Sequence, residues 1–313
     1  MDTKEIIGRI LAETGKAVLG KEDVLREILT AILAGGHILI DDIPGVGKTT
    51  IAVAFTHALG LSYKRMQFTP DVLPSDITGF SMYDKDTGNF RYVPGAAMTN
   101  FFLADEINRA SPKTQSALLE VMQEGKLSVD GKTHAVPQPF IVMATQNPFG
   151  SSGTQELPES QTDRFMIRTT VGYPAPADEL AILKGGIQPA DTVSPVVTAA
   201  ELEELRKSAA AVHVEDSLYE YMVAIAQATR RDGDIALGIS PRGTMALAAM
   251  TRARALMEGR TYAVPDDITA VAPYTLSHRI AVTGEARFAG KTPASVLSAV
   301  LAAIPLPRLS EEA

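Results

Sequence analysis

Hydrophobic residues in the first half of the chain form short runs that alternate with helical patterns. Apolar side chains between Val24 and Leu33 recur at helical spacing, and Gly35-Gly36 ends that helix. A second helix is predicted over residues 49–59, which Gly60 ends. Strands are predicted at residues 37–41, 64–68, 100–104, 140–145 and 165–171. Strands that alternate with helices predict an α/β fold whose mostly parallel sheet is covered on both faces.

Two segments interrupt this alternation. In residues 81–94, a polar stretch separates Met82-Tyr83 from an apolar segment that begins at Phe90. In residues 126–136, Asp130-Gly131 lies between two alternating segments. An Asp-Gly pair in that setting is a strong signal for a hairpin turn. We therefore expect two β-hairpins that decorate the sheet.

From Tyr173 onward the strand pattern fades and helical spacing dominates. Helices are predicted at residues 178–184, 199–212, 217–229, 241–258, 265–276 and 293–303. The boundary is placed near Gly172, where the strand pattern ends. The sequence thus predicts an α/β nucleotide-type domain over residues 1–172 and a small helical domain over residues 173–313.

Composition limits the classes of function. The 313 residues are 45% hydrophobic and 21% charged, which suits a globular protein. The 29 Lys+Arg against 37 Asp+Glu give a net charge of −8, which argues against broad electrostatic binding to nucleic acid or to an anionic membrane. Cysteine is absent, so no disulfide or thiolate chemistry is available. No apolar run approaches the roughly 18 residues of a membrane span, and no secretory signal pattern begins the chain, so a cytoplasmic location without membrane insertion is expected.

A glycine-rich loop follows the first predicted strand. It consists of Pro44, Gly45, Val46, Gly47, Lys48, Thr49 and Thr50. In a phosphate loop, backbone N–H groups point at phosphate oxygens, the lysine faces the β- and γ-phosphates, and the hydroxyl binds Mg²⁺. Asp42 stands where such a loop has its first glycine. A carboxylate that faces the triphosphate would weaken binding and one that faces away would not, and the sequence leaves both alternatives open.

Polar residues follow two further predicted strands. Asp105 and Glu106 come directly after a run of apolar residues, and Asn147 follows residues 140–145. Ligands of open α/β sheets bind at the carboxyl ends of the strands. We expect Asp105 to bind Mg²⁺ through water and Glu106 to deprotonate the attacking water. Asn147 is a candidate partner of that water or of the γ-phosphate, although Asn-Pro is also an ordinary turn pair.

Two arginines are candidate phosphate ligands. Arg242 lies in the first turn of a helix that Ser240 caps and Pro241 begins. The helix dipole disfavours a cation there, so an anionic ligand would offset the cost; a solvated arginine is the alternative. Arg164 follows Asp163 before the last predicted strand. It either pairs with Asp163 or reaches the nucleotide of a neighbouring subunit.

Together these segments resemble the MoxR-type AAA+ ATPases. The resemblance covers nearly the whole chain and includes residues 67–71, 103–110, 144–148, 157–165, 237–242 and 264–268 in order. It implies an AAA+ core with a five-stranded parallel sheet, followed by an all-α lid. Residues 81–94 would be the helix-2 insert and residues 126–136 the hairpin before sensor 1. The implied roles are Walker A for Lys48 and Thr49, Walker B for Asp105 and Glu106, sensor 1 for Asn147, arginine finger for Arg164 and sensor 2 for Arg242.

The resemblance also implies an activity: Mg²⁺-dependent ATP hydrolysis by a homo-oligomeric, hexameric ring that remodels protein clients. Such proteins often act with a partner that carries a von Willebrand factor A domain, and they are linked to metal insertion or complex maturation. Two alternatives come from other classes. The net charge and the acidic insert argue against a nucleic-acid motor. Intact Glu106, Asn147 and Arg164 argue against a nucleotide-gated scaffold without turnover.

Overall fold

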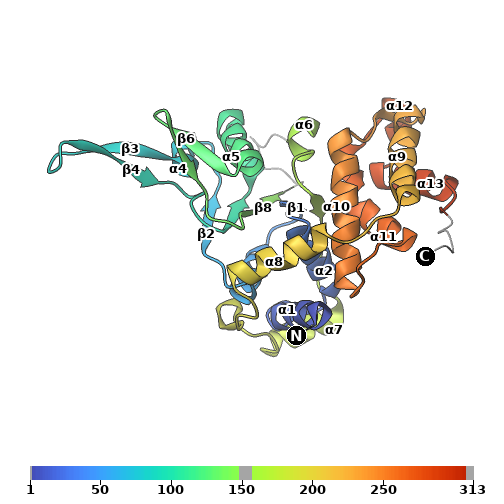
Figure 1. Cartoon of the computed structure of the whole chain (residues 1–313), viewed down its shortest axis with the longest axis horizontal. Coiled ribbons are helices and arrows are strands. Elements are labelled where there is room, and N and C mark those ends of the chain that lie inside the picture. The colour runs from blue at the N-terminus through green and yellow to red at the C-terminus, as the bar shows by residue number, and fades with distance from the viewer. Residues whose placement is uncertain (1, 148–156, 308–313) are drawn as a thin grey trace.

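The computed structural model describes residues 2–147 and 157–307, and Figure 1 shows their arrangement. A five-stranded parallel sheet with the strand order β2-β5-β8-β1-β9 forms the centre of the N-terminal half. Its strands are β1 (Ile38–Asp41), β2 (Tyr63–Gln67), β5 (Phe101–Asp105), β8 (Ile141–Gln146) and β9 (Ile167–Thr169). The predicted parallel sheet is therefore confirmed. The strand β9 is shorter than predicted: Phe165 and Val171, which bounded the predicted strand, are buried in the segments that flank it.

Helices cover both faces of this sheet. They are α1 (Thr3–Gly15), α2 (Glu22–Leu33), α3 (Lys48–Ala58), α4 (Pro74–Thr78), α5 (Pro112–Glu124) and α6 (Glu159–Thr162), with a 3₁₀ turn at Ile107–Arg109. Successive residues of a strand point to opposite faces. Ile38 and Ile40 accordingly belong to one buried cluster, and Leu39 belongs to another. Burial on both faces explains why the central strands are continuous apolar runs.

Both predicted hairpins are present. Strands β3 (Gly79–Asp84) and β4 (Asn89–Pro94) form one, and β6 (Lys126–Val129) and β7 (Lys132–Ala135) form the other. The hairpin β3–β4 projects from the body of the molecule at the left of Figure 1. The rings of Tyr92 and His134 stack with centroids 3.9 Å apart, so the two hairpins contact each other.

The C-terminal half is mainly helical, as predicted. Its helices are α7 (Pro176–Leu183), α8 (Ala199–Ala210), α9 (Asp216–Arg231), α10 (Pro241–Met257), α11 (Pro265–Leu276), α12 (Gly284–Phe288) and α13 (Pro293–Ala303), with 3₁₀ turns at Ala190–Thr192 and Ser277–Arg279. The prediction of an all-α lid needs one correction. Strands β10 (Ile235–Leu237) and β11 (Ala281–Val282) pair antiparallel in this half. They are too short to produce a periodic pattern in the sequence.

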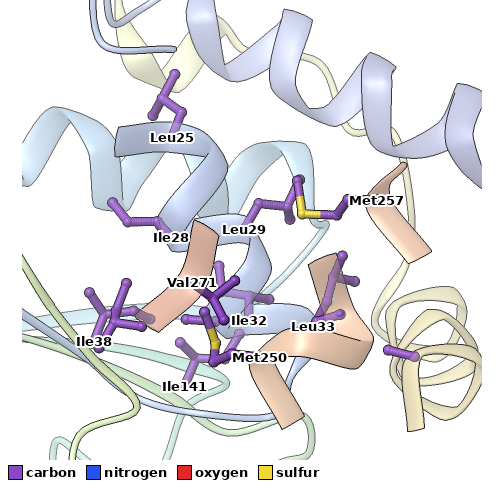
Figure 2. Close-up of a cluster of buried hydrophobic side chains, with 14 of the residues drawn as sticks. Leu25, Ile28, Leu29, Ile32, Leu33, Ile38, Ile141, Met250, Met257 and Val271 are labelled. Carbon is purple, nitrogen blue, oxygen red and sulfur yellow. The ribbon is translucent and has the colours of Figure 1, made fainter. Parts of the chain in front are cut away.

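The two halves share a hydrophobic core around α2. Figure 2 shows Leu29 and Ile32 of α2 beside Met250 and Met257 of α10, with Val271 of α11 in the same cluster. The division at Gly172 stays a prediction. Within the described residues, no helix is both long enough and apolar enough to span a bilayer.

Candidate active site

The phosphate loop lies between β1 and α3. Gly45 and Gly47 have φ angles of +86° and +92°. This left-handed region is open to glycine and disfavoured for other residues. Nothing lies within 4 Å of where their Cβ atoms would be, so backbone conformation and not space requires glycine here. Helix α3 begins at Lys48, and its first N–H groups and positive dipole end therefore face this loop.

A polar cavity of about 420 Å³ brings the predicted phosphate and metal residues together. Both carboxylates, Asp105 and Glu106, line it, and so do two residues of β2 that the sequence analysis did not single out, Arg65 and Gln67. The loop residues in its wall are Pro44, Gly45, Gly47, Lys48, Thr49 and Thr50. Burial lowers the pKa of Lys48, and the nearby carboxylates, led by Asp42, act in the opposite direction.

Thr145 of β8 holds the two acidic residues in place. Its hydroxyl donates to Asp105 Oδ1 at 2.6 Å and accepts from the Glu106 N–H at 2.9 Å. Glu106 directly follows β5 and has a φ angle of +55°. This left-handed conformation is unusual for a residue other than glycine. Arg65 donates to Asp105 Oδ2 at 2.7 Å, and Arg109 donates to Glu106 Oε2 at 2.8 Å. One carboxylate oxygen of each acidic residue is thus paired with an arginine.

The residues at this site fit a magnesium ion. Mg²⁺ prefers oxygen ligands and is usually held by one or two carboxylates together with phosphates and water. Thr49 and Asp105 line the same cavity and supply a hydroxyl and a carboxylate. Among residues 2–147 and 157–307, no cluster of three or more histidine, cysteine or acidic side chains forms a self-contained metal site. The remaining ligands of an ion held here would therefore be phosphate and water oxygens.

The side chain of Asp42 turns away from the phosphate loop. Its carboxylate accepts hydrogen bonds from the N–H groups of Ile43, Val171 and Gly172 at 2.6–2.7 Å. The residue is buried. The structure thus answers the question that the sequence left open: three backbone donors satisfy this carboxylate away from the phosphate position.

An apolar cavity adjoins the phosphate loop. Val46, the remaining predicted loop residue, lines it together with Val18 and Leu19 before α2, and with Pro174 and Ile182 around α7. Its volume of about 240 Å³ and its largely apolar lining suit a flat heterocyclic base beside the phosphate position. Apart from Val46, these residues could not be identified from the sequence, because single apolar side chains from distant segments carry no motif.

Asn147 directly follows β8, the neighbour of both β1 and β5 in the sheet. Its backbone carbonyl accepts a hydrogen bond from Asn108 Nδ2 at 3.4 Å. It is not among the residues that line the polar cavity. The adjoining residues 148–156, which include the proline of the predicted Asn-Pro turn, lie outside the described part of the chain.

Arg164 and Arg242 lie apart from the phosphate loop of their own chain. Both line a separate cavity between the sheet domain and α10. Asp163 accepts from Arg279 Nε at 2.9 Å and lies 3.9 Å from Arg242 Nη1, so its ion pairs are with these two residues and not with Arg164. The cost of a cation at the start of α10 is thus offset by a carboxylate of the protein. Arg279 was not identified from the sequence.

Comparisons with known proteins place the chain in a family. Residues 37–167 match the profile described as "ATPase family associated with various cellular activities (AAA)", and residues 227–300 match an AAA lid domain. The chain is 44% identical to the uncharacterized protein YeaC of Bacillus subtilis (strain 168), over 98% of this chain and 96% of that one. It is 38% identical to the chaperone MoxR1 of Mycobacterium tuberculosis, over 96% of this chain and 82% of that one.

A solved structure agrees with these relatives. The crystal structure of a candidate ATPase from Cytophaga hutchinsonii superposes with a TM-score of 0.91 at 33% sequence identity and covers 98% of this chain and 96% of that one. The likeness extends over both the parallel sheet and the lid. With a nucleotide-type cavity built from a phosphate loop and two carboxylates, the chain belongs to the MoxR-type AAA+ ATPases and is an ATP hydrolase.

Proposed function

We propose that this protein couples Mg²⁺-dependent ATP hydrolysis to chaperone-like remodelling or maturation of protein clients, as a subunit of a ring. The observation that carries the proposal is the polar cavity that collects Lys48, Thr49, Asp105 and Glu106 beside an apolar cavity of suitable size for a base. Family membership supports the activity, and the positions of single residues support the roles proposed for them.

Each residue of the cavity has a proposed role. Lys48 binds the β- and γ-phosphates together with the N–H groups at the start of α3. Thr49 and Asp105 hold Mg²⁺, which when bound would offset the negative charge of the phosphate oxygens. Glu106 accepts a proton from the attacking water. Asn147, at the end of the neighbouring strand β8, orients that water.

Arg164 and Arg242 are proposed to act on the nucleotide of a neighbouring subunit. The support is that both arginines line one cavity and that no residue of the phosphate loop lines it with them. In the proposed ring, this surface would face the phosphate loop of the next copy. An arginine supplied in this way stabilises the charge that develops as the γ-phosphoryl group is transferred. A hexamer is the proposed ring size.

The hairpin β3–β4 is the proposed contact for a protein client. It projects from the body (Figure 1), and its exposed side chains include Phe80, Met82, Tyr83 and Phe90, the last with 69% of its surface accessible. Exposed apolar and aromatic groups in one place mark surfaces that bind other proteins. A partner with a von Willebrand factor A domain, a cytoplasmic location and a link to metal insertion are part of the same proposal by family likeness.

Substitution of Lys48 tests the proposed function. Lys48→Ala removes the ammonium from the phosphate position, so the affinity for ATP measured by calorimetry is expected to fall by at least about 100-fold, the range of a lost charge-assisted interaction. Lys207→Ala is the control, because Lys207 is exposed on α8 and pairs with the equally exposed Glu204. Unchanged ATP affinity in a folded Lys48→Ala protein would show that the loop is not the phosphate site.

A further inference from the structure

Asp42 contacts the phosphate loop through its backbone and the chain beyond β9 through its side chain. Its carbonyl oxygen accepts a hydrogen bond from Lys48 Nζ at 2.6 Å. Its Oδ2 atom accepts from the N–H groups of Val171 and Gly172, each at 2.6 Å, and its Oδ1 atom accepts from the Ile43 N–H at 2.7 Å. Only 7% of the residue is exposed. A buried carboxylate with three donors is held firmly in one position.

Val171 and Gly172 lie in the segment that leads from β9 to the C-terminal helices. Gly172 has a φ angle of +65°, and nothing lies within 4 Å of where its Cβ would be, so its conformation and not its surroundings requires glycine. Two successive N–H groups that converge on one oxygen form a backbone arrangement that binds anions. Two residues further on, Pro174 lines the apolar cavity beside the phosphate loop. The anchored segment is thus part of the wall of the proposed base site.

We propose that Asp42 is a positioning residue that links nucleotide binding at the phosphate loop to the junction at Val171 and Gly172. The inference rests on the proposed role of Lys48 as a ligand of the triphosphate. When Lys48 turns to phosphate oxygens it leaves the carbonyl oxygen of Asp42. The carboxylate of the same residue is fixed to the junction, so a shift of the Asp42 backbone moves the segment that carries Pro174. In reverse, the position of the junction sets the orientation of the loop.

The link requires a carboxylate and not only a side chain of this shape. Asparagine has one acceptor oxygen and one NH₂ donor where aspartate has two acceptors. Either orientation of the amide therefore sets its NH₂ group against at least one of the N–H groups of Ile43, Val171 and Gly172. A buried donor without a partner carries a free-energy penalty, so Asp42→Asn loosens the anchor while the volume stays the same.

The adjacent carboxylate supplies a matched control. Asp41 is also 7% exposed and also joins β1 to the β9 side of the sheet, through an ion pair with Arg168. Its partner is a side chain of β9 and not the junction backbone, and the carbonyl oxygen that accepts from Lys48 belongs to Asp42 and not to Asp41. Asp41→Asn is therefore expected to lower stability while the response of the junction to nucleotide remains.

The experiment uses the full chain with Glu106→Gln as the parent, so that ATP stays bound. ATP affinity is measured by calorimetry, and hydrogen exchange of a peptide that spans residues 171–174 is measured with and without saturating ATP. In the parent, ATP is expected to change exchange at the junction. Adding Asp42→Asn is expected to weaken ATP binding by about tenfold, or about 1.4 kcal/mol, and to remove the response of the junction at saturating ATP. Adding Asp41→Asn is expected to keep that response.

Gly172→Ala tests the link at the junction, and it replaces Asp42→Asn in the experiment if that variant does not fold. Alanine disfavours the φ angle that aims the N–H groups at Asp42, yet Gly172 does not line the phosphate cavity. The same weakening of ATP binding is expected. The inference is overturned if the parent binds ATP without any change at the junction, or if the Asp42→Asn and Gly172→Ala proteins keep the parent's response. A parent that does not bind ATP would instead contradict the proposed function.

Discussion

Arg279 is the buried cation that fastens the lid to the segment around the proposed arginine finger. Only 2% of its side chain is exposed. Its Nε donates to Asp163 Oδ1 at 2.9 Å, and its Nη2 donates to the carbonyl oxygen of Phe165 at 2.7 Å. Its Nη1 donates to the carbonyl oxygen of Thr275 in α11 at 2.6 Å. Burial lowers the pKa of Arg279 to about 10, so the guanidinium remains charged at pH 7.

Arg279→Met keeps much of the volume but removes every one of these donors. Removal of one partner of a buried ion pair costs about 3–5 kcal/mol. Asp163 keeps a hydrogen bond from Ser240 Oγ at 3.0 Å and lies 3.9 Å from Arg242, so the lower end of that range is expected. The free energy of unfolding, measured by urea denaturation, should therefore fall by about 3 kcal/mol.

The same substitution should also lower ATP turnover more than ATP binding, because Asp163 and Phe165 flank Arg164 and not the phosphate loop. Arg231→Met is the control, since Arg231 is exposed on α9 and makes one long hydrogen bond, to Gln227 at 3.4 Å. That control is expected to change stability by less than about 0.5 kcal/mol. A loss of less than about 1 kcal/mol in Arg279→Met would refute the reasoning that this buried pair anchors the lid.

Two further predictions concern the proposed base and a buried histidine. Glu106→Gln keeps the shape of the side chain but removes the base, so ATP should bind while turnover falls by about 10²–10⁴-fold; a fall of less than about threefold would remove Glu106 from that role. His37 accepts from the Val142 N–H and contacts the Met122 carbonyl, and burial lowers its pKa to about 4. The unfolded state binds a proton near pH 6.5 and the folded state does not until about pH 4. The free energy of unfolding therefore decreases as the pH is lowered through this window. When the pH is lowered from 7 to 5, the free energy of unfolding measured by urea denaturation should fall by about 2 kcal/mol more in the wild type than in His37→Asn. Equal losses in the two proteins would exclude this titration.

The elements that could be predicted from the sequence are those whose signal is local. The apolar run before Asp105 fixes a strand, and Gly45 through Thr49 specify a loop between a strand and a helix whatever lies elsewhere in the chain. The Asp130-Gly131 turn similarly determines its own hairpin, and both residues have positive φ angles. Only a few sheet topologies are compatible with this alternation of strands and helices.

The parts that could not be predicted depend on partners far apart in sequence. Asp42 meets Gly172 across 130 positions and Arg279 meets Asp163 across 116, and neither pair has a pattern that periodicity detects. From the sequence, Asp163 was a candidate partner of the adjacent Arg164, whereas in the folded protein it forms an ion pair with Arg279. The ribbon β10–β11 was missed because its strands have only three and two residues.

The central claim is that Arg164 of one subunit completes the active site of the next. The direct measurement is ATP turnover of mixed rings that contain Glu106→Gln and Arg164→Ala subunits, with mixing verified by differently tagged chains. Each variant alone should be nearly inactive, because one lacks the base and the other lacks the finger, which contributes on the order of 10³–10⁵ in rate. Mixed rings contain interfaces that pair an intact Glu106 with an intact Arg164, and they should regain activity well above the sum of the separate variants. Mixed rings that show only that sum would contradict a role of Arg164 in the neighbouring site.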